Sequence, residues 1–140
     1  MTTSATDTLT LLYTSDVHGH MLPLRYADNS PAEYGLLKLA SIVKQVRKER
    51  RNALFLDNGD LLQGTPFAYY HACLDRETPH PIVAVMNALE LDAFIPGNHE
   101  FNYGLPFVER ARAESAYPWL SANLLREGTE EPYFGCPYRL

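Results

Sequence analysis

The 140-residue sequence has few of the features that mark membrane proteins, disulfide-rich proteins or nucleic-acid-binding proteins. Its two cysteines, Cys73 and Cys136, lie far apart and form no Cys-x-x-Cys pair, so the sequence indicates neither a zinc site nor a disulfide framework. No run approaches the roughly 20 apolar residues that a membrane-spanning helix needs. A formal net charge of −5 argues against a large nucleic-acid-binding surface, which normally carries a basic patch.

The N-terminal residues 1–8 (MTTSATDT) lack the basic and apolar regions of a signal peptide. We expect a short tail there. As written, the chain is expected to be cytoplasmic, or periplasmic or extracellular if a leader has been removed. Residues 9–140 are expected to form one domain or part of one. The basic run at 44–51 (KQVRKERR) is interpreted as the solvated end of a helix, where cations stabilise the helix dipole.

Short apolar runs alternate with helical patterns along the chain. Apolar residues at i, i+3 and i+4 predict helices at 34–50 and 81–91, and shorter helices are predicted at 67–74 and 105–114. The predicted strands are 9–15, 53–56, 92–96 and 119–124, with an extended segment at 133–140. This β-α-β-α-β-α-β order is typical of an α/β domain. In such domains, the carboxyl ends of parallel strands share the edge at which ligands bind.

Three polar motifs each follow a predicted strand: Asp16-x-His18-Gly19, Gly59-Asp60 and Gly97-Asn98-His99-Glu100. The gaps between Asp16, Asp60 and Asn98 are 44 and 38 residues. Each gap is long enough for a strand–helix–strand unit, which needs roughly 30 residues or more. We therefore expect the three motifs to converge at one edge of the sheet.

The residue types in these motifs suit a two-metal site. In an extended segment Asp16 and His18 would point the same way, and their oxygen and nitrogen donors suit Mn²⁺, Fe, Co²⁺ or Zn²⁺. Asp60 follows a glycine that permits a tight turn, and its carboxylate could bridge two cations ~3.5–4 Å apart. Asn98 offers an amide oxygen, and His99 can act as an acid or stabilise a transition state.

Each motif also has an ordinary explanation when it is taken alone. Asp-x-His-Gly and Gly-Asn are common turn sequences, and Asp60 could cap a helix or form an Asx-turn. We interpret Asp57 as a hydrogen-bonding residue at a strand end rather than as a ligand. His20 is expected near the site without binding metal, and the remaining histidines away from the motifs, His71 and His80, are expected to be structural or solvent-facing.

Four runs, in this order and spacing, resemble the calcineurin-like metallophosphoesterase superfamily, in its branch of 5′-nucleotidases and 2′,3′-cyclic-nucleotide phosphodiesterases. The runs are SDVHG, DNGDLLQGTP, VMNALELDAFIPGNHEFNYG and PWLSANL. The resemblance implies the N-terminal portion of a four-layer αββα sandwich. It also implies a metal-dependent phosphoric ester hydrolase with two divalent cations (Mn, Zn, Co or Fe) and a nucleotide substrate.

The resemblance further implies a role for each motif residue. Asp16 and His18 would bind the first metal, Asp60 would bridge both, and Asn98 would bind the second. His99 would be the catalytic histidine, and together with Asn98 it would contact the substrate phosphate. Asn102 stands where 5′-nucleotidases carry an aspartate that orients this histidine. The FNYG form is similar to enzymes that open 2′,3′-cyclic nucleotides and then remove a 3′-phosphate, which is the activity we expect here.

The family takes further metal ligands from a downstream Gly-His-x-His segment and another histidine, and no histidine follows His99 in this sequence. We therefore expect a partial metallophosphoesterase domain at 9–140, little turnover by the isolated chain, and a missing C-terminal portion of the same enzyme as its partner. The alternatives within the family are a 5′-nucleotidase or a nucleotide-sugar hydrolase. A non-catalytic metal-binding or interaction fragment is the alternative outside enzymes.

Overall fold

The computed structural model describes residues 7–140, so the predicted N-terminal tail, residues 1–8, lies largely outside the described residues. The strands are β1 (Thr10–Thr14), β2 (Ala53–Asp57) and β3 (Ala93–Phe94). The helices are α1 (Leu36–Glu49), α2 (Pro66–Tyr69), the π-helical η1 (Tyr70–Leu74), α3 (Pro81–Ala88), the 3-10 helix η2 (His99–Tyr103) and α4 (Leu105–Glu114). Within this described part, no helix has both the length and the hydrophobicity to cross a membrane.

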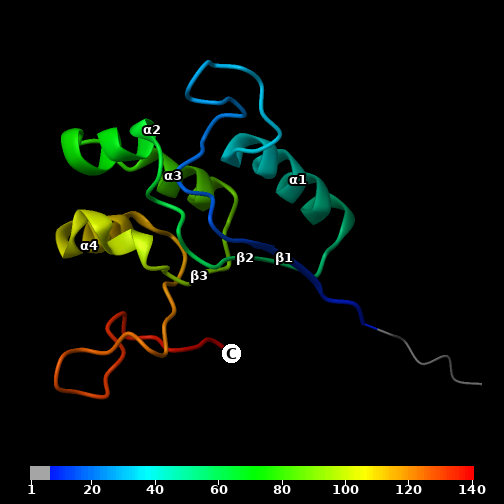
Figure 1. Cartoon of the computed structure of the whole chain (residues 1–140). Helices are drawn as coiled ribbons and strands as arrows, with labels where there is room; N and C mark the ends of the chain where they lie inside the picture. The colour runs from blue at the N-terminus through cyan, green and yellow to red at the C-terminus, as the bar shows by residue number, and fades with distance from the viewer. Residues whose placement is uncertain (1–6) are drawn as a thin grey trace, which may run out of the picture.

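The strands form one parallel sheet in the order β1-β2-β3. Figure 1 shows α1, α2 and α3 on the same side of this sheet. The strand pattern matches that arrangement, because Phe55 of β2 is fully buried, whereas Leu11 and Tyr13 of β1 are 59% and 75% exposed. The predicted α/β class with a parallel sheet is confirmed. The described residues cover one face of the sheet with helices, as expected for half of a sandwich.

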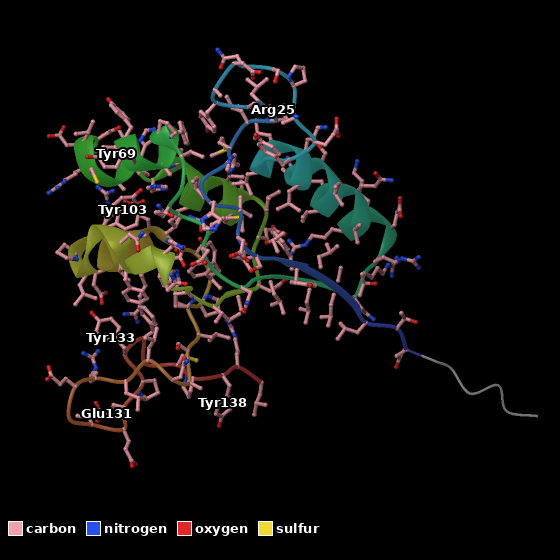
Figure 2. All side chains as sticks on the ribbon, in the orientation of Figure 1. Arg25, Tyr69, Tyr103, Glu131, Tyr133 and Tyr138 are labelled. Atoms are coloured by element: carbon pink, nitrogen blue, oxygen red, sulfur yellow. The ribbon has the colours of Figure 1, made fainter. Side chains whose placement is uncertain are left out.

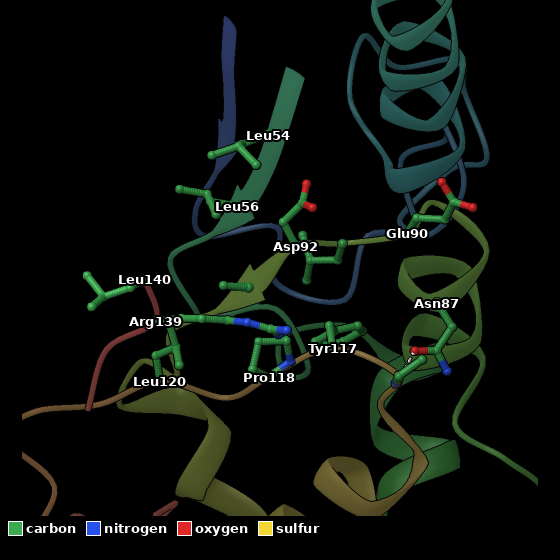
Figure 3. Close-up of a pocket in the computed structure, with 13 residues that line it drawn as sticks. Leu54, Leu56, Asn87, Glu90, Asp92, Tyr117, Pro118, Leu120, Arg139 and Leu140 are labelled. Atoms are coloured by element: carbon green, nitrogen blue, oxygen red, sulfur yellow. Dashed lines mark hydrogen bonds between the residues drawn. The ribbon is translucent and has the colours of Figure 1, made fainter. Parts of the chain in front are cut away.

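The other face of the sheet is apolar and open to solvent. A groove of about 710 Å³ crosses it. Leu54 and Leu56 of β2 lie at one side of this groove, opposite Leu120 and the C-terminal residues Arg139 and Leu140 (Figure 3). None of the residues predicted to bind metal lines it. The groove is therefore separate from the candidate site described below.

The helix predicted at 67–74 differs from expectation in detail. Helix 67–74 begins one residue earlier, because Pro66 takes the first helical position and the Thr65 hydroxyl accepts a hydrogen bond from Ala68 N at 3.2 Å. It then continues as the π-helical η1. Tyr69 of α2 and Tyr103 of η2 point toward one another across the space between α2 and α4 (Figure 2), with ring centroids 6.1 Å apart.

The predicted strand at 119–124 and the extended segment at 133–140 were wrong in extent. Trp119 makes one isolated parallel bridge to Phe94 of β3, after which the Ser121 hydroxyl donates to the side chain of Asn123 at 2.8 Å and the chain bends away. At the second segment, Gly135 N donates to Pro132 O and adopts a φ of +76°. Local side-chain and turn hydrogen bonds thus end the extended conformation in both places.

The basic run at 44–51 contains a structural residue as well as solvated ones. The guanidinium of Arg47 donates to Leu89 O and Glu90 O, each at 2.7 Å, and to the Asp92 carboxylate at 2.8 Å. Asp92 in turn accepts a hydrogen bond from Phe55 N at 2.8 Å. Arg47 therefore ties the end of α1 to the turn between α3 and β3.

His71 and His80, which we expected to be structural or solvent-facing, belong to a buried cluster between η1, α3 and α4. The His80 ring is fully buried and lies 5.6 Å from the ring of Phe107 and 6.2 Å from that of His71. Neither ring nitrogen of His80 has a hydrogen-bond partner. Burial, together with His71 and Arg110, lowers the pKa of His80 to about 4. His80 is consequently neutral in the folded protein at neutral pH.

Candidate metal centre

The loops that follow β1 and β2 are held together by backbone hydrogen bonds, and the loop after β3 joins them through His99 N, which donates to Oδ1 of Asp60 at 2.9 Å. Asp16 N donates to Gly59 O at 3.0 Å, and His18 N donates to Asp60 O at 2.8 Å. These bonds extend the β1–β2 pairing into the loops beyond the strand ends. The predicted convergence of the motifs at one edge of the sheet is therefore observed.

Two glycines allow the second and third loops to approach each other closely. Gly59 adopts a φ of +86°, and a Cβ atom there would lie 2.2 Å from Gly97 N. A Cβ atom on Gly97 would lie 2.3 Å from Oδ1 of Asp60. Any larger residue would push the loops apart, because non-bonded heavy atoms require separations well above these distances.

Asp16, His18 and Asp60 come together as one group of donors. One ligand atom from each lies within 4.8 Å of the others. Nε2 of His18 lies 3.8 Å from Oδ1 of Asp16, and Nδ1 of His18 faces Gln63 O at 3.2 Å. That second contact fixes the ring orientation and leaves Nε2 directed toward the carboxylates. Two carboxylates and an imidazole fit a divalent transition-metal ion.

The physical reason for the convergence of Asp16 and His18 differs from the prediction. The segment is not extended, because both residues adopt left-handed conformations, with φ of +58° and +49°. Asp60 is also left-handed, with a φ of +54°. Such angles are uncommon for residues other than glycine and occur preferentially at functional sites, where surrounding contacts hold them. All three donors of the group thus sit on tightly turned backbone rather than on strand ends.

His99 and Asn102 lie beside these donors. The His99 ring centroid is 5.1 Å from that of His18, and His99 N donates to Oδ1 of Asp60 at 2.9 Å. The amide nitrogen of Asn102 lies 3.1 Å from Nδ1 of His99. Asn98, which directly precedes His99 at the start of η2, is exposed. The structure therefore gathers the loops that carry all six predicted site residues.

Asp57 and His20 have other environments. Asp57 is fully buried and accepts hydrogen bonds from the Thr14 hydroxyl at 2.5 Å and from Gly59 N at 3.0 Å. Burial raises the pKa of Asp57 to about 7. The ring of His20 packs against Tyr34, with centroids 4.8 Å apart. Neither belongs to the group of converging donors among the described residues.

Sequence reasoning missed Glu100. Its carboxylate is fully buried and accepts hydrogen bonds from four backbone N–H groups, three of them in the loop that carries Asp60. The only sign in the sequence is its place in the Gly97–Glu100 run, where an acidic residue directly follows a candidate catalytic histidine.

The chain is similar to several known proteins. Residues 9–137 match the calcineurin-like phosphoesterase family. A 2′,3′-cyclic-nucleotide 2′-phosphodiesterase/3′-nucleotidase of Haemophilus influenzae is 37% identical over 133 residues, which cover 93% of this chain and 20% of that protein. A 5′-nucleotidase of Homo sapiens is 35% identical over 126 residues, which cover 86% of this chain and 21% of that protein.

The same likeness is found among solved structures. The crystal structure of the calcineurin-like phosphoesterase YfkN from Bacillus subtilis matches with a TM-score of 0.77 and 33% identity, covering 91% of this chain and 44% of that one. The chain spans about a fifth of the length of the two curated relatives. A parallel sheet with Asp16, His18 and Asp60 at its edge, together with a family match over residues 9–137, leads to one conclusion: the chain belongs to the calcineurin-like phosphoesterase family.

Proposed function

We propose that this chain carries the N-terminal part of the metal centre of an enzyme that hydrolyses 2′,3′-cyclic nucleotides and 3′-nucleotides. The observation that carries the proposal is the contact between Asn102 and Nδ1 of His99, beside the donors Asp16, His18 and Asp60. The Haemophilus influenzae relative, which has that activity in its name, supports the choice of substrate.

In this proposal two divalent cations occupy the site. Asp16, His18, Asp60 and Asn98 would hold them. When bound, the cations neutralise charge on the phosphate and activate water for hydrolysis. Their identity is proposed to be Mn, Zn, Co or Fe, because carboxylate and imidazole donors suit these metals. We further propose that the remaining donors come from parts of the enzyme outside this chain.

Asn102 determines which nitrogen of His99 carries the proton. An amide nitrogen is only a donor, so with this nitrogen facing Nδ1 the neutral ring carries its proton on Nε2. Nε2–H is then free to donate a hydrogen bond to a phosphate oxygen. Protonation of the leaving oxygen would instead require the charged ring, because a neutral imidazole that gave up its only N–H proton would become an anion. An aspartate at the same position could only accept, so it would require a proton on Nδ1 and would favour the charged ring.

A 5′-nucleotidase is the second candidate, because a human 5′-nucleotidase is 35% identical to this chain. The two candidates differ in the position of the phosphate on the ribose. They use the same metal centre, so the residues bound to metal do not separate them. The assay must therefore compare substrates.

The test is an assay of the full-length protein that contains this chain, with Mn²⁺ and three substrates: 2′,3′-cyclic AMP, 3′-AMP and 5′-AMP. We expect release of 3′-AMP from the cyclic nucleotide, followed by adenosine. The Asp60→Asn variant should lose activity, because an amide cannot place a negative charge between two cations. The control Asp28→Asn changes an exposed loop residue that bonds Ser30 and should keep activity. Hydrolysis of 5′-AMP alone would contradict the proposal.

A further inference from the structure

We infer that Glu100 is a positioning residue for the metal centre, because its buried carboxylate joins the loop that carries Asp60 to the loop that carries Asn98 and His99. The inference rests on the proposed metal site. Glu100 is not one of the converging donors themselves. Its role concerns how the ligand-bearing backbone is held.

The carboxylate divides its hydrogen bonds between the two loops. Oε1 accepts from Leu61 N at 2.8 Å and from Leu62 N at 3.1 Å. Oε2 accepts from Asp60 N at 2.8 Å and from Gly97 N at 2.7 Å. Oε2 therefore joins the two loops directly. It bonds the peptide nitrogen of Asp60 in one loop and that of Gly97, the residue before Asn98, in the other.

The left-handed conformation of Asp60 makes this support necessary. A φ of +54° at a non-glycine residue persists only where surrounding contacts hold it. The Asp60 side chain is held as well, because its Oδ1 accepts from His99 N at 2.9 Å. Glu100 thus fixes the backbone of Asp60, and the η2 backbone fixes its carboxylate.

Charge and burial make Glu100 hard to replace. Hydrogen bonds to an ionised carboxylate are roughly twice as strong as neutral ones. A glutamine at this position has one oxygen and one NH₂ group, so it can accept from only one of the two pairs of N–H donors. The other pair would face the NH₂ group and remain without an acceptor inside the protein. The loops of Asp60 and Gly97 would then separate or shift.

The test measures Mn²⁺ binding to the full-length protein by the loss of the free Mn²⁺ signal in electron paramagnetic resonance. Glu100→Gln is compared with Glu100→Asp and with the control Glu114→Gln. Glu114 also accepts a backbone hydrogen bond, from His80 N at 2.6 Å. It belongs to the buried cluster around His80 and not to the loops of the candidate site. Hydrogen exchange of peptides covering residues 58–64 and urea unfolding are measured for each protein.

For Glu100→Gln we expect Mn²⁺ affinity to fall about 10- to 100-fold, the usual effect of losing an outer partner of metal ligands, with faster exchange at 58–64. Glu100→Asp keeps the charge and should bind with intermediate affinity. Glu114→Gln should lower stability and leave the affinity unchanged, because distant sites act independently. A purely structural role for Glu100 would give the pattern of Glu114→Gln instead.

The outcomes separate the inference from the proposed function. If Glu100→Gln binds Mn²⁺ as tightly as the wild type, the inference is wrong and the metal site stands. If the wild type itself binds no Mn²⁺, both are overturned. Should Glu100→Gln not fold, Glu100→Asp decides the question: weaker binding by a folded variant supports the inference, and wild-type affinity refutes it.

Discussion

Acidification should destabilise the protein through His80, which the fold buries without hydrogen-bond partners for its ring. In the unfolded chain a histidine binds a proton when the pH falls below its ordinary pKa of 6.5. In the folded state, burial lowers the pKa of His80 to about 4. The unfolded state therefore binds more protons between these values, and stability falls as pH decreases. The contribution of the neutral His80 ring to the free energy of unfolding is fully present above pH 6.5 and is lost progressively as pH falls toward 4.

The magnitude follows from this difference in pKa. Two and a half units correspond to about 3 kcal/mol in total, of which about 2.5 kcal/mol is lost by pH 4.5. The groups that act on His80 are His71 from η1 and Arg110 from α4, and Glu114 of α4 accepts a hydrogen bond from His80 N. Asp75 pairs with His71 rather than with His80. Both His71 and Arg110 act in the same direction as burial and lower the pKa of His80.

The assay is urea unfolding, followed by circular dichroism, at intervals from pH 7 to pH 4.5. His80→Leu removes the titrating ring, and because that ring makes no hydrogen bonds the cost at pH 7 should stay below about 1.5 kcal/mol. At pH 4.5 the variant should be more stable than the wild type by about 1–2.5 kcal/mol. His20→Gln, outside the cluster, should retain the wild-type pH dependence. A constant difference between wild type and His80→Leu over this pH range would refute the reasoning.

Three further predictions concern the loops of the candidate site and the hydrogen bonds of Arg47. Asn102→Asp should extend activity to higher pH, because a carboxylate beside His99 stabilises the charged ring. The measurement is kcat as a function of pH, and an unchanged profile would contradict the role assigned to Asn102. Gly59→Ala should destabilise the fold by about 2–5 kcal/mol, which is the sum of the cost of an alanine in the left-handed conformation and the cost of overpacking. If urea unfolding shows a loss of stability well below ~1 kcal/mol, the close approach of the loops is contradicted. Arg47→Met should cost about 1–3 kcal/mol, because it leaves backbone carbonyls without their donor; Arg51→Met, an exposed neighbour in the same basic run, should change the unfolding midpoint little.

The sequence predicted most of the regular elements for a simple reason. Helix α1 is encoded by the spacing of Leu36, Leu39 and Val43, of which Leu36 and Val43 are fully buried. Periodicity of this kind is a local property, so it can be read without the rest of the chain. The strand predicted at 119–124 failed because, within residues 7–140, it pairs through one bridge to Phe94, which itself belongs to a two-residue strand. A pattern of apolar residues does not reveal how many of them find a partner.

The group of metal donors was predicted from motif order and from the rule that parallel strands end at one edge. Asp16, His18 and Asp60 do converge. The conformation that brings them together was not predicted, because the left-handed backbone of Asp16 and His18 depends on hydrogen bonds to the neighbouring loop. For His80 the sequence left two outcomes open, structural or solvent-facing, and the structure shows the ring buried. The sequence could not choose between them, since this burial depends on packing between separate helices.

By itself, the sequence predicted the order of most strands and helices, the family, and the side chains that are candidates for metal and acid chemistry. These follow from spacing and residue type along the chain. Only the tertiary structure decided how the donor loops are supported. The carboxylate of Glu100 bonds Leu61 N and Leu62 N across 39 and 38 residues of sequence. No local pattern records such contacts, because a buried carboxylate needs donors that only the folded backbone brings within hydrogen-bonding distance.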